Sequence, residues 1–198
     1  MSADGSTTDR LPPLTAEQMT PEQRAAAAEI SAGPRGAVIG PFAPLLRSPE
    51  LMTRLQKVGE YLRYDSPLDR RLFEMTILWV ARWWDQQFEW SYHHPLALAA
   101  GLDAAIADAI AEDRRPDGMD DDEAAVWEVL DELFRTRHVS DPTWAAAVDR
   151  LGEAGVVEVV ATAGYYTTLA VVMNAARTAA PRGPYLPDVR TVPAGETR

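Results

Sequence analysis

The sequence contains no cysteine. This absence excludes disulfides, thiolate zinc sites, iron–sulfur clusters, CxxC redox pairs and any cysteine nucleophile. Any chemistry that this protein carries out therefore proceeds without sulfur nucleophiles.

Basic residues are scarce. The 198 residues include 19 Lys and Arg against 30 Asp and Glu, for a formal net charge of −11. Such a field opposes binding to nucleic acid or to an anionic membrane, so we expect neither as a partner. The charge is local, because 12 acidic residues and only two arginines lie between Asp103 and Glu132. We expect this stretch to serve solubility rather than substrate binding.

Long hydrophobic runs are also rare. The exception, residues 159–176, is uncharged over 18 residues, which barely reaches the length needed to span a bilayer. It includes several polar side chains, so a buried core helix is the better prediction. The amino terminus shows no basic segment leading into an apolar one, and we expect a cytoplasmic location.

Strand signals are almost absent, whereas helix signals recur along the chain. Helix starts are indicated by four cap-and-proline patterns: Thr20-Pro21 with Gln23, Ser48-Pro49, Ser66-Pro67 with Asp69, and Asp141-Pro142. Pro95 is expected to kink or divide its segment, and a helix should end near Gly152. We predict a single all-α domain over residues 18–180 with about eight helices. Residues 33–44 should form a loop, and residues 1–17 and 181–198 should form extended arms.

The densest cluster of unusual residues is WWDQQFEWSYHH, residues 83–94. Glu89 and His93 stand four apart, so on a helix their side chains share one face. A carboxylate bonded to one ring nitrogen would fix the tautomer and leave the other nitrogen free to move a proton. The alternative is a surface ion pair without chemistry.

Glu74 lies in an otherwise apolar segment, where a carboxylate is costly unless it is paired or used. It could take part in proton transfer, or it could form an ion pair with Arg70, Arg71 or Arg82. The other two histidines are weaker candidates. His94 precedes Pro95 and is expected to line a turn, and His138 is expected to lie in a loop.

These residues resemble the carboxymuconolactone decarboxylase family, which also contains the alkylhydroperoxidase D enzymes. The resemblance covers about residues 45–178. It rests on Glu74 lying 15 residues before Glu89, on FEWSYHHPLALAAGL, and on VVEVVATAGYYTTLAVVMNAA. It implies an all-α fold of the alkylhydroperoxidase D-like type and homo-oligomers, often trimers or hexamers.

The peroxidase branch of the family uses two thiols, and their positions fall on Gln86 and Glu89 here. Thiol peroxidase activity is therefore excluded. Glutamate followed by Trp90 is typical of the decarboxylase-like branch. The resemblance thus implies cofactor-independent decarboxylation, or a related lyase, isomerase or hydrolase step, on a small cyclic carboxylated metabolite. His93 is the candidate acid, oriented by Glu89 or Glu74.

Such a site needs an apolar pocket and a cation that orients the substrate carboxylate. We predict that Arg82 or Arg71 supplies the cation and that Gln86 belongs to the substrate site. The predicted aromatic residues of the pocket are Trp83, Trp84, Phe88, Trp90, Tyr165 and Tyr166, although core packing is an alternative role for the two tyrosines.

Two other interpretations stay open at this stage. Glu74, Glu89 and His93, with or without His94, could hold a metal ion, since carboxylate and imidazole are common ligands. The chain could also be a non-catalytic oligomeric helical protein or a small-molecule binder. Our prediction names no cofactor and no metal.

Overall fold

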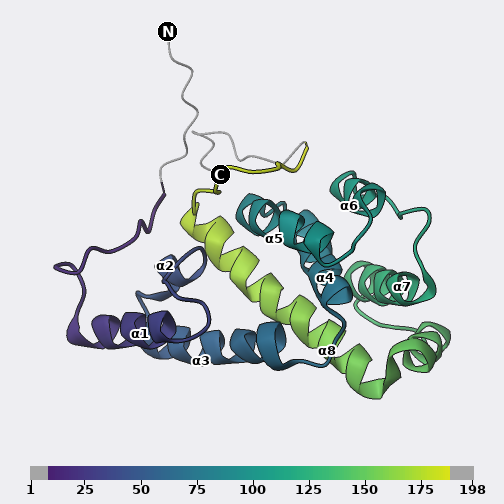
Figure 1. The fold of residues 1–198 in the computed structure, drawn as a ribbon, viewed down its shortest axis with the longest axis horizontal. Helices are drawn as coiled ribbons and strands as arrows, with labels where there is room; N and C mark the ends of the chain where they lie inside the picture. The colour runs from purple at the N-terminus through teal and green to yellow at the C-terminus, as the bar shows by residue number, and fades with distance from the viewer. Residues whose placement is uncertain (1–8, 188–198) are drawn as a thin grey trace, which may run out of the picture.

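A computed structural model describes residues 9–187, and it confirms the predicted all-α fold: this part of the chain contains no strand. Figure 1 shows the arrangement, in which the long last helix crosses the middle of the molecule diagonally. The elements are α1 (Pro21–Ala32), α2 (Phe42–Leu45), α3 (Pro49–Glu60), the π-helical turn η1 (Tyr61–Asp65), α4 (Arg70–Trp83), α5 (Gln87–Ala99), α6 (Ala104–Ala111), α7 (Asp121–Thr136) and α8 (Asp141–Ala176).

Most helix starts follow the caps that the sequence indicates. Thr20 forms a capping box with Gln23, which satisfies donors that the first turn of α1 would otherwise leave unpaired. The helix predicted to start at Ser66 is α4, and its start is three residues later. Asp69, not Ser66, accepts hydrogen bonds from the first backbone amides of α4. The predicted loop over residues 33–44 also needs correction, because it includes the start of α2.

Pro95 does not divide its segment, contrary to the prediction. It lies inside α5, a continuous helix from Gln87 to Ala99. Trp90 and His93 are buried before the proline, and Ala97 is buried after it. Packing on both sides holds the helix together, so the loss of one backbone donor is tolerated.

The core is built around α4, which is buried nearly all round and packs against α5, α7 and α8. This position explains why its sequence is apolar on every face. On the side of Figure 1 where α1 and α3 lie, α2 packs against both α3 and α8. The helices that meet at the core are those that carry the predicted site.

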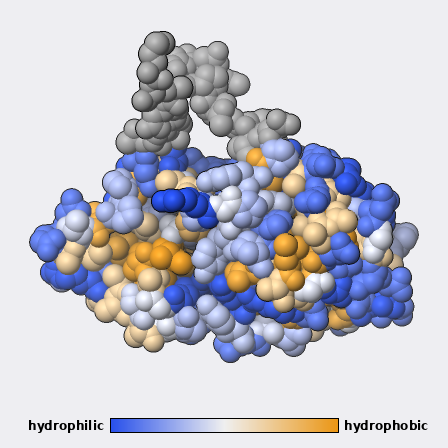
Figure 2. Space-filling view, turned by 45° about the horizontal axis from the view of Figure 1, so that its top comes forward, coloured by the Kyte–Doolittle hydropathy of each residue, from blue (hydrophilic) through white to orange (hydrophobic). Residues whose placement is uncertain are grey.

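The last helix is broken by Gly152, whose backbone angles (φ 69°, ψ 163°) are not helical. By length and composition α8 could cross a membrane, yet half of its most apolar window is buried within the protein. It packs on α4 and α7, as a core helix does. Figure 2 shows apolar residues on the visible face in patches separated by hydrophilic ones. The fold is compatible with a soluble protein.

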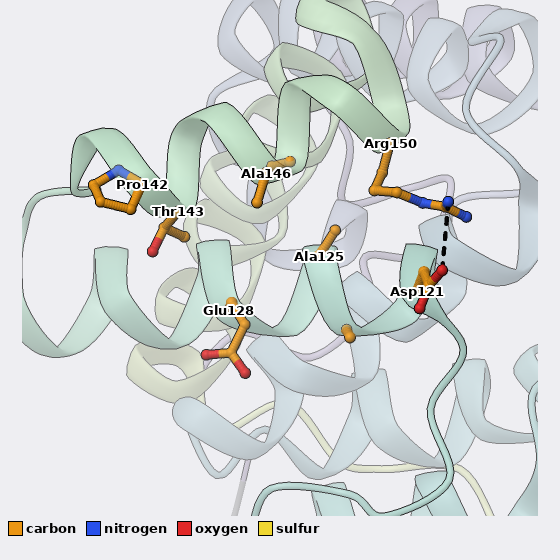
Figure 3. A pocket seen from close by; sticks show the side chains of 9 residues that line it. Asp121, Ala125, Glu128, Pro142, Thr143, Ala146 and Arg150 are labelled. Atoms are coloured by element: carbon orange, nitrogen blue, oxygen red, sulfur yellow. Dashed lines mark ion pairs between the residues drawn. The ribbon is translucent and has the colours of Figure 1, made fainter.

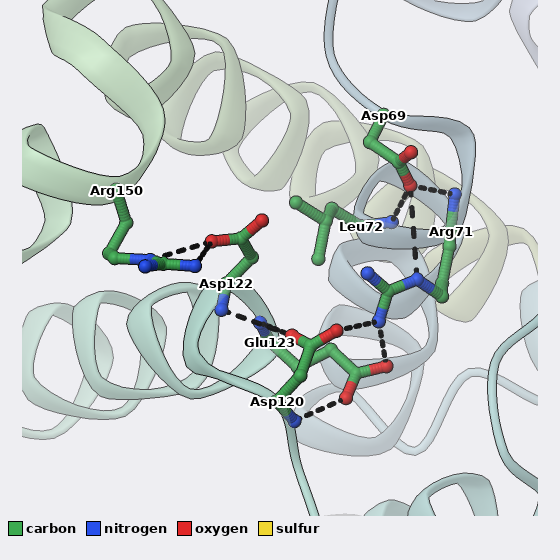
Figure 4. Close-up of polar contacts among 7 residues, drawn as sticks. All are labelled: Asp69, Arg71, Leu72, Asp120, Asp122, Glu123 and Arg150. Carbon is green, nitrogen blue, oxygen red and sulfur yellow. Dashed lines mark hydrogen bonds and ion pairs between the residues drawn. The ribbon is translucent and has the colours of Figure 1, made fainter.

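The acidic stretch also has structural roles. Asp120 caps α7, and together with Glu123 it forms ion pairs with Arg71 at the start of α4 (Figure 4). Burial raises the pKa of Asp120, but hydrogen bonds from backbone amides and from Arg71 outweigh burial and lower it overall. Solubility is therefore not the only role of this stretch, because these carboxylates join α4 to α7.

Parts of both predicted arms contact the helices. The backbone amide of Arg10 donates to the carbonyl of Ala176 at the end of α8. Ser91 on α5 donates to the carbonyl of Pro184, and Leu186 is buried. Residues 1–8 and 188–198, the remainder of the predicted arms, lie outside the described residues.

Candidate functional site

The structure brings Glu74, Glu89 and His93 together inside the protein. Nδ1 of His93 lies 2.7 Å from Oε2 of Glu74, and its Nε2 lies 3.3 Å from Oε2 of Glu89. All three side chains are buried, with exposed fractions of 0% for Glu74 and 3% for each of the others. The imidazole ring is thus held at both nitrogens between two carboxylates.

Glu74 comes from α4, and its second oxygen forms an ion pair with Arg70. Of the three arginines considered from sequence, Arg70 is the partner, and Glu74 also binds His93. The ion pair with an arginine is therefore present, and a contact with the His93 ring accompanies it. A buried carboxylate without partners would be very costly, so these contacts fix the orientation of Glu74.

His93 is biased toward its charged form. Burial lowers the pKa of the imidazole, but the hydrogen bonds and negative charges of Glu74 and Glu89 outweigh burial and raise it overall. An imidazolium can donate from both nitrogens, which matches a carboxylate on each side. His93 can therefore supply a proton to Glu89 or take one from it.

Glu89 is the carboxylate that opens onto a cavity. Its Oε2 faces His93, whereas its Oε1 is buried and has no hydrogen-bond partner among the described residues. Both Glu89 and His93 line a cavity of about 30 Å³, room for about one water molecule. The site thus presents a carboxylate oxygen to a small enclosed space and a proton donor behind it.

Two arginines that the sequence interpretation missed also line this cavity: Arg35, from the segment before α2, and Arg63, from η1. Neither forms an ion pair within residues 9–187. Arg35 lies over the Phe42 ring at 4.7 Å, and Arg63 lies over the Tyr92 ring at 5.4 Å. No periodic pattern in the sequence marks Arg35. Arg63 lies on a π-helical turn, so its side chain points in a different direction from the one that a continuous α-helix would give it.

Arg71 and Arg82, the predicted cations, do not line the cavity at His93. Arg71 is held by Asp120 and Glu123, as Figure 4 shows. Arg82 forms an ion pair with Asp85 at 2.8 Å. Each guanidinium thus already has a carboxylate partner, at the start of α7 for Arg71 and just after α4 for Arg82.

Three further predicted site residues also lie away from the cavity lining. Gln86 caps α5, because its side-chain oxygen accepts from two backbone amides while its nitrogen donates to Asn174 on α8. Trp83 stacks on Trp79 in the core. Trp90 is buried in the core with its ring 5.5 Å from that of His94. Of the predicted aromatic walls, Phe88 and Tyr166 do line the cavity.

Tyr165 is buried and does not line the cavity. A Cβ atom added at Gly59 would lie 2.0 Å from the Tyr165 hydroxyl and 2.6 Å from Nη2 of Arg35, so both groups lie close to the bare backbone of this glycine. Burial raises the pKa of Tyr165 to about 12. Its hydroxyl therefore stays protonated near neutral pH and is a donor.

The metal interpretation finds no support in the donor geometry. Within residues 9–187, no group of three or more His, Asp or Glu side chains is arranged to hold a metal ion. Glu74 and Glu89 lie at opposite nitrogens of the same ring, so the three side chains do not point at one common centre.

A larger groove lies elsewhere, between α7 and the first part of α8 (Figure 3). It measures about 380 Å³, and its lining includes four alanines and an ion pair of 3.4 Å between Arg150 and Asp121. None of the predicted site residues lines it. The buried relay and the small cavity thus remain the better candidate.

The fold and the relay on α4 and α5 define a helical protein of the alkylhydroperoxidase D-like class. Residues 49–132 match the model of the carboxymuconolactone decarboxylase family. The match includes Glu74, Glu89, His93 and Arg63, whereas Arg35 and Tyr166 lie outside it. No curated protein matches the chain significantly.

Proposed function

We propose that this protein is a cofactor-independent enzyme of the carboxymuconolactone decarboxylase type that decarboxylates a small, unsaturated, cyclic carboxylate. The observation that carries the proposal is the Glu74–His93–Glu89 relay, in which Glu89 lines a small cavity and keeps one oxygen without a hydrogen-bond partner among the described residues. A buried, oriented carboxyl group backed by an imidazolium is suited to proton transfer at carbon.

In the proposed reaction, the bond between the ring carbon and the substrate carboxylate breaks and CO₂ leaves. The electron pair stays in the conjugated system of the substrate. The His93 imidazolium passes its proton from Nε2 to the Glu89 carboxylate, and Glu89 gives this proton to the ring carbon. The site regains its starting state when solvent reprotonates His93. Glu74 acts as a positioning residue, because it holds Nδ1 and does not line the cavity.

The apolar rings around the cavity support this chemistry. Phe88 and Tyr166 line it beside Glu89, which lowers the local polarity. A carboxylate is less stable in such surroundings than in water. The decarboxylation product spreads its charge over the conjugated system, so it loses less stabilisation than the carboxylate does when water is excluded. The cavity is far below the roughly 300 Å³ of a typical ligand site, so its walls must move apart to admit a ring.

The first prediction tests the proton carrier. Glu89→Gln and His93→Asn should each lower kcat by about 10² to 10⁴, because proton transfer to carbon is lost. The substrates are five-membered unsaturated lactones that carry one carboxylate. The readouts are CO₂ release and deuterium at the product carbon when the reaction runs in D₂O.

Glu50→Gln is the matched control, since Glu50 is an exposed carboxylate on α3 that pairs with Arg54. It should keep wild-type turnover. Full activity in Glu89→Gln would contradict the proposed role. If the wild type releases CO₂ from none of these lactones, the proposed reaction is wrong.

A further inference from the structure

The cavity beside Glu89 has unused hydrogen-bond donors. Nε and Nη2 of Arg35, Nε of Arg63 and the hydroxyl of Tyr165 are all buried without a hydrogen-bond partner among the described residues. Buried polar groups are nearly always paired in native proteins, so this concentration at one place calls for an acceptor. The one unpartnered acceptor at this cavity is Oε1 of Glu89.

The charges around the cavity favour an anion. Arg70 and the His93 imidazolium balance the carboxylates of Glu74 and Glu89, which leaves the guanidinium groups of Arg35 and Arg63 without a carboxylate partner at the cavity. Burial lowers the pKa of Arg63, but nearby tyrosines raise it overall, so Arg63 keeps its charge. A negative charge from a ligand would reduce this excess of positive charge.

The surroundings also favour a planar group. Arg35 lies against the Phe42 ring and Arg63 against the rings of Tyr64 and Tyr92, so each guanidinium has an aromatic ring on one face. Stacking of this kind leaves the edges of a guanidinium free to donate, and those edges match the two oxygens of a carboxylate.

We infer that Arg35 and Arg63 form the site that binds the substrate's carboxylate, with Tyr165 positioning Arg35 from behind. The ligand class is a small monocarboxylate on a flat, apolar ring, which Phe42 and Phe88 of the cavity lining would contact once the walls move apart. The inference rests on the proposed function for the reaction at Glu89, but binding of the anion itself does not require turnover.

The test is direct binding to the full chain, measured by titration calorimetry. The probes are acetate, 2-furoate and benzoate, each compared with its neutral amide. The wild type should bind at least one carboxylate about tenfold or more tightly than the matching amide, since charged hydrogen bonds are the strong ones. Arg35→Gln and Arg63→Gln should each remove most of that preference.

Arg54→Gln is the control, because Arg54 is an exposed arginine paired with Glu50 and does not line this cavity. It should bind like the wild type. Glu89→Gln and His93→Asn should still bind the carboxylates, so a failed reaction and a failed anion site give different results.

Two outcomes overturn the inference. In the first, the wild type binds none of the three carboxylates more tightly than the matching amide. This result does not depend on whether any variant folds. The second is an unchanged preference in folded Arg35→Gln and Arg63→Gln.

Discussion

At the scale of single residues, the central feature is a histidine that is bonded at both ring nitrogens. The contact with Glu74 fixes Nδ1, and the contact with Glu89 takes Nε2. The ring cannot rotate without breaking its contacts with two buried carboxylates, which would be destabilising. Its protonation is therefore linked to the stability of the fold.

This linkage gives a pH prediction. Because the pKa of His93 is raised in the folded state, its contribution to stability is fully present below the unfolded value of about 6.5. It is lost as pH rises through the higher folded pKa. The free energy of unfolding, measured in urea from about pH 6 to pH 9, should fall with pH more steeply in the wild type than in His93→Gln.

His138→Gln is the control for that measurement, since His138 lies on the surface between α7 and α8. Its pH dependence should follow the wild type. If the free energy of unfolding depends on pH equally in the wild type and in His93→Gln, the pKa of His93 is not raised by folding.

At the scale of elements, the segment before α2 determines how tightly the cavity is closed. Gly40 has a positive φ of 56°, and a Cβ there would lie 2.5 Å from a ring carbon of Phe88. Bare backbone at this position lets the segment lie directly on α5. Because this segment packs on α5, its residue Arg35 and the following Phe42 lie at the cavity.

The corresponding prediction compares two glycines. Gly40→Ala should destabilise the fold by about 2–4 kcal/mol, from backbone strain together with displacement of Phe88. Gly36→Ala also has a positive φ, of 73°, but no atom lies within 4 Å of its added Cβ, so only strain of about 1 kcal/mol is expected. Urea unfolding measures both variants. Equal decreases in the free energy of unfolding in the two variants would mean that the close approach of Gly40 to Phe88 adds nothing to the cost of Gly40→Ala.

Local signals predicted most of the helices and the relay. Caps such as Thr20 act within a few residues, and the four-residue spacing of Glu89 and His93 has one geometric meaning on a helix. The arginines at this cavity could not be predicted, because any arginine near the motif looks equivalent until its partners are known. Arg71 pairs with carboxylates at the start of α7 and Arg82 with the nearby Asp85, whereas Arg35 comes from a glycine- and proline-rich segment.

At the scale of the whole molecule, the predicted trimer or hexamer stays a prediction. Large apolar side chains on the outer side of α3 and η1, including Leu51, Val58 and Tyr61, are each about half exposed. We expect light scattering to give three or six times the chain mass of 21.8 kDa. A single-chain mass at every concentration tested would contradict this expectation.

The cavity is assembled from parts of the chain with different relations to the family. The proton-transfer residues on α4 and α5 lie within the matched segment, whereas Arg35, Phe42 and Tyr166 lie before or after it. The proposed anion site therefore joins one arginine from inside the matched segment, Arg63, to one from before it, Arg35. If the two proposals hold, an exchange of residues 33–46 changes one side of the anion site and leaves the proposed proton carrier in place.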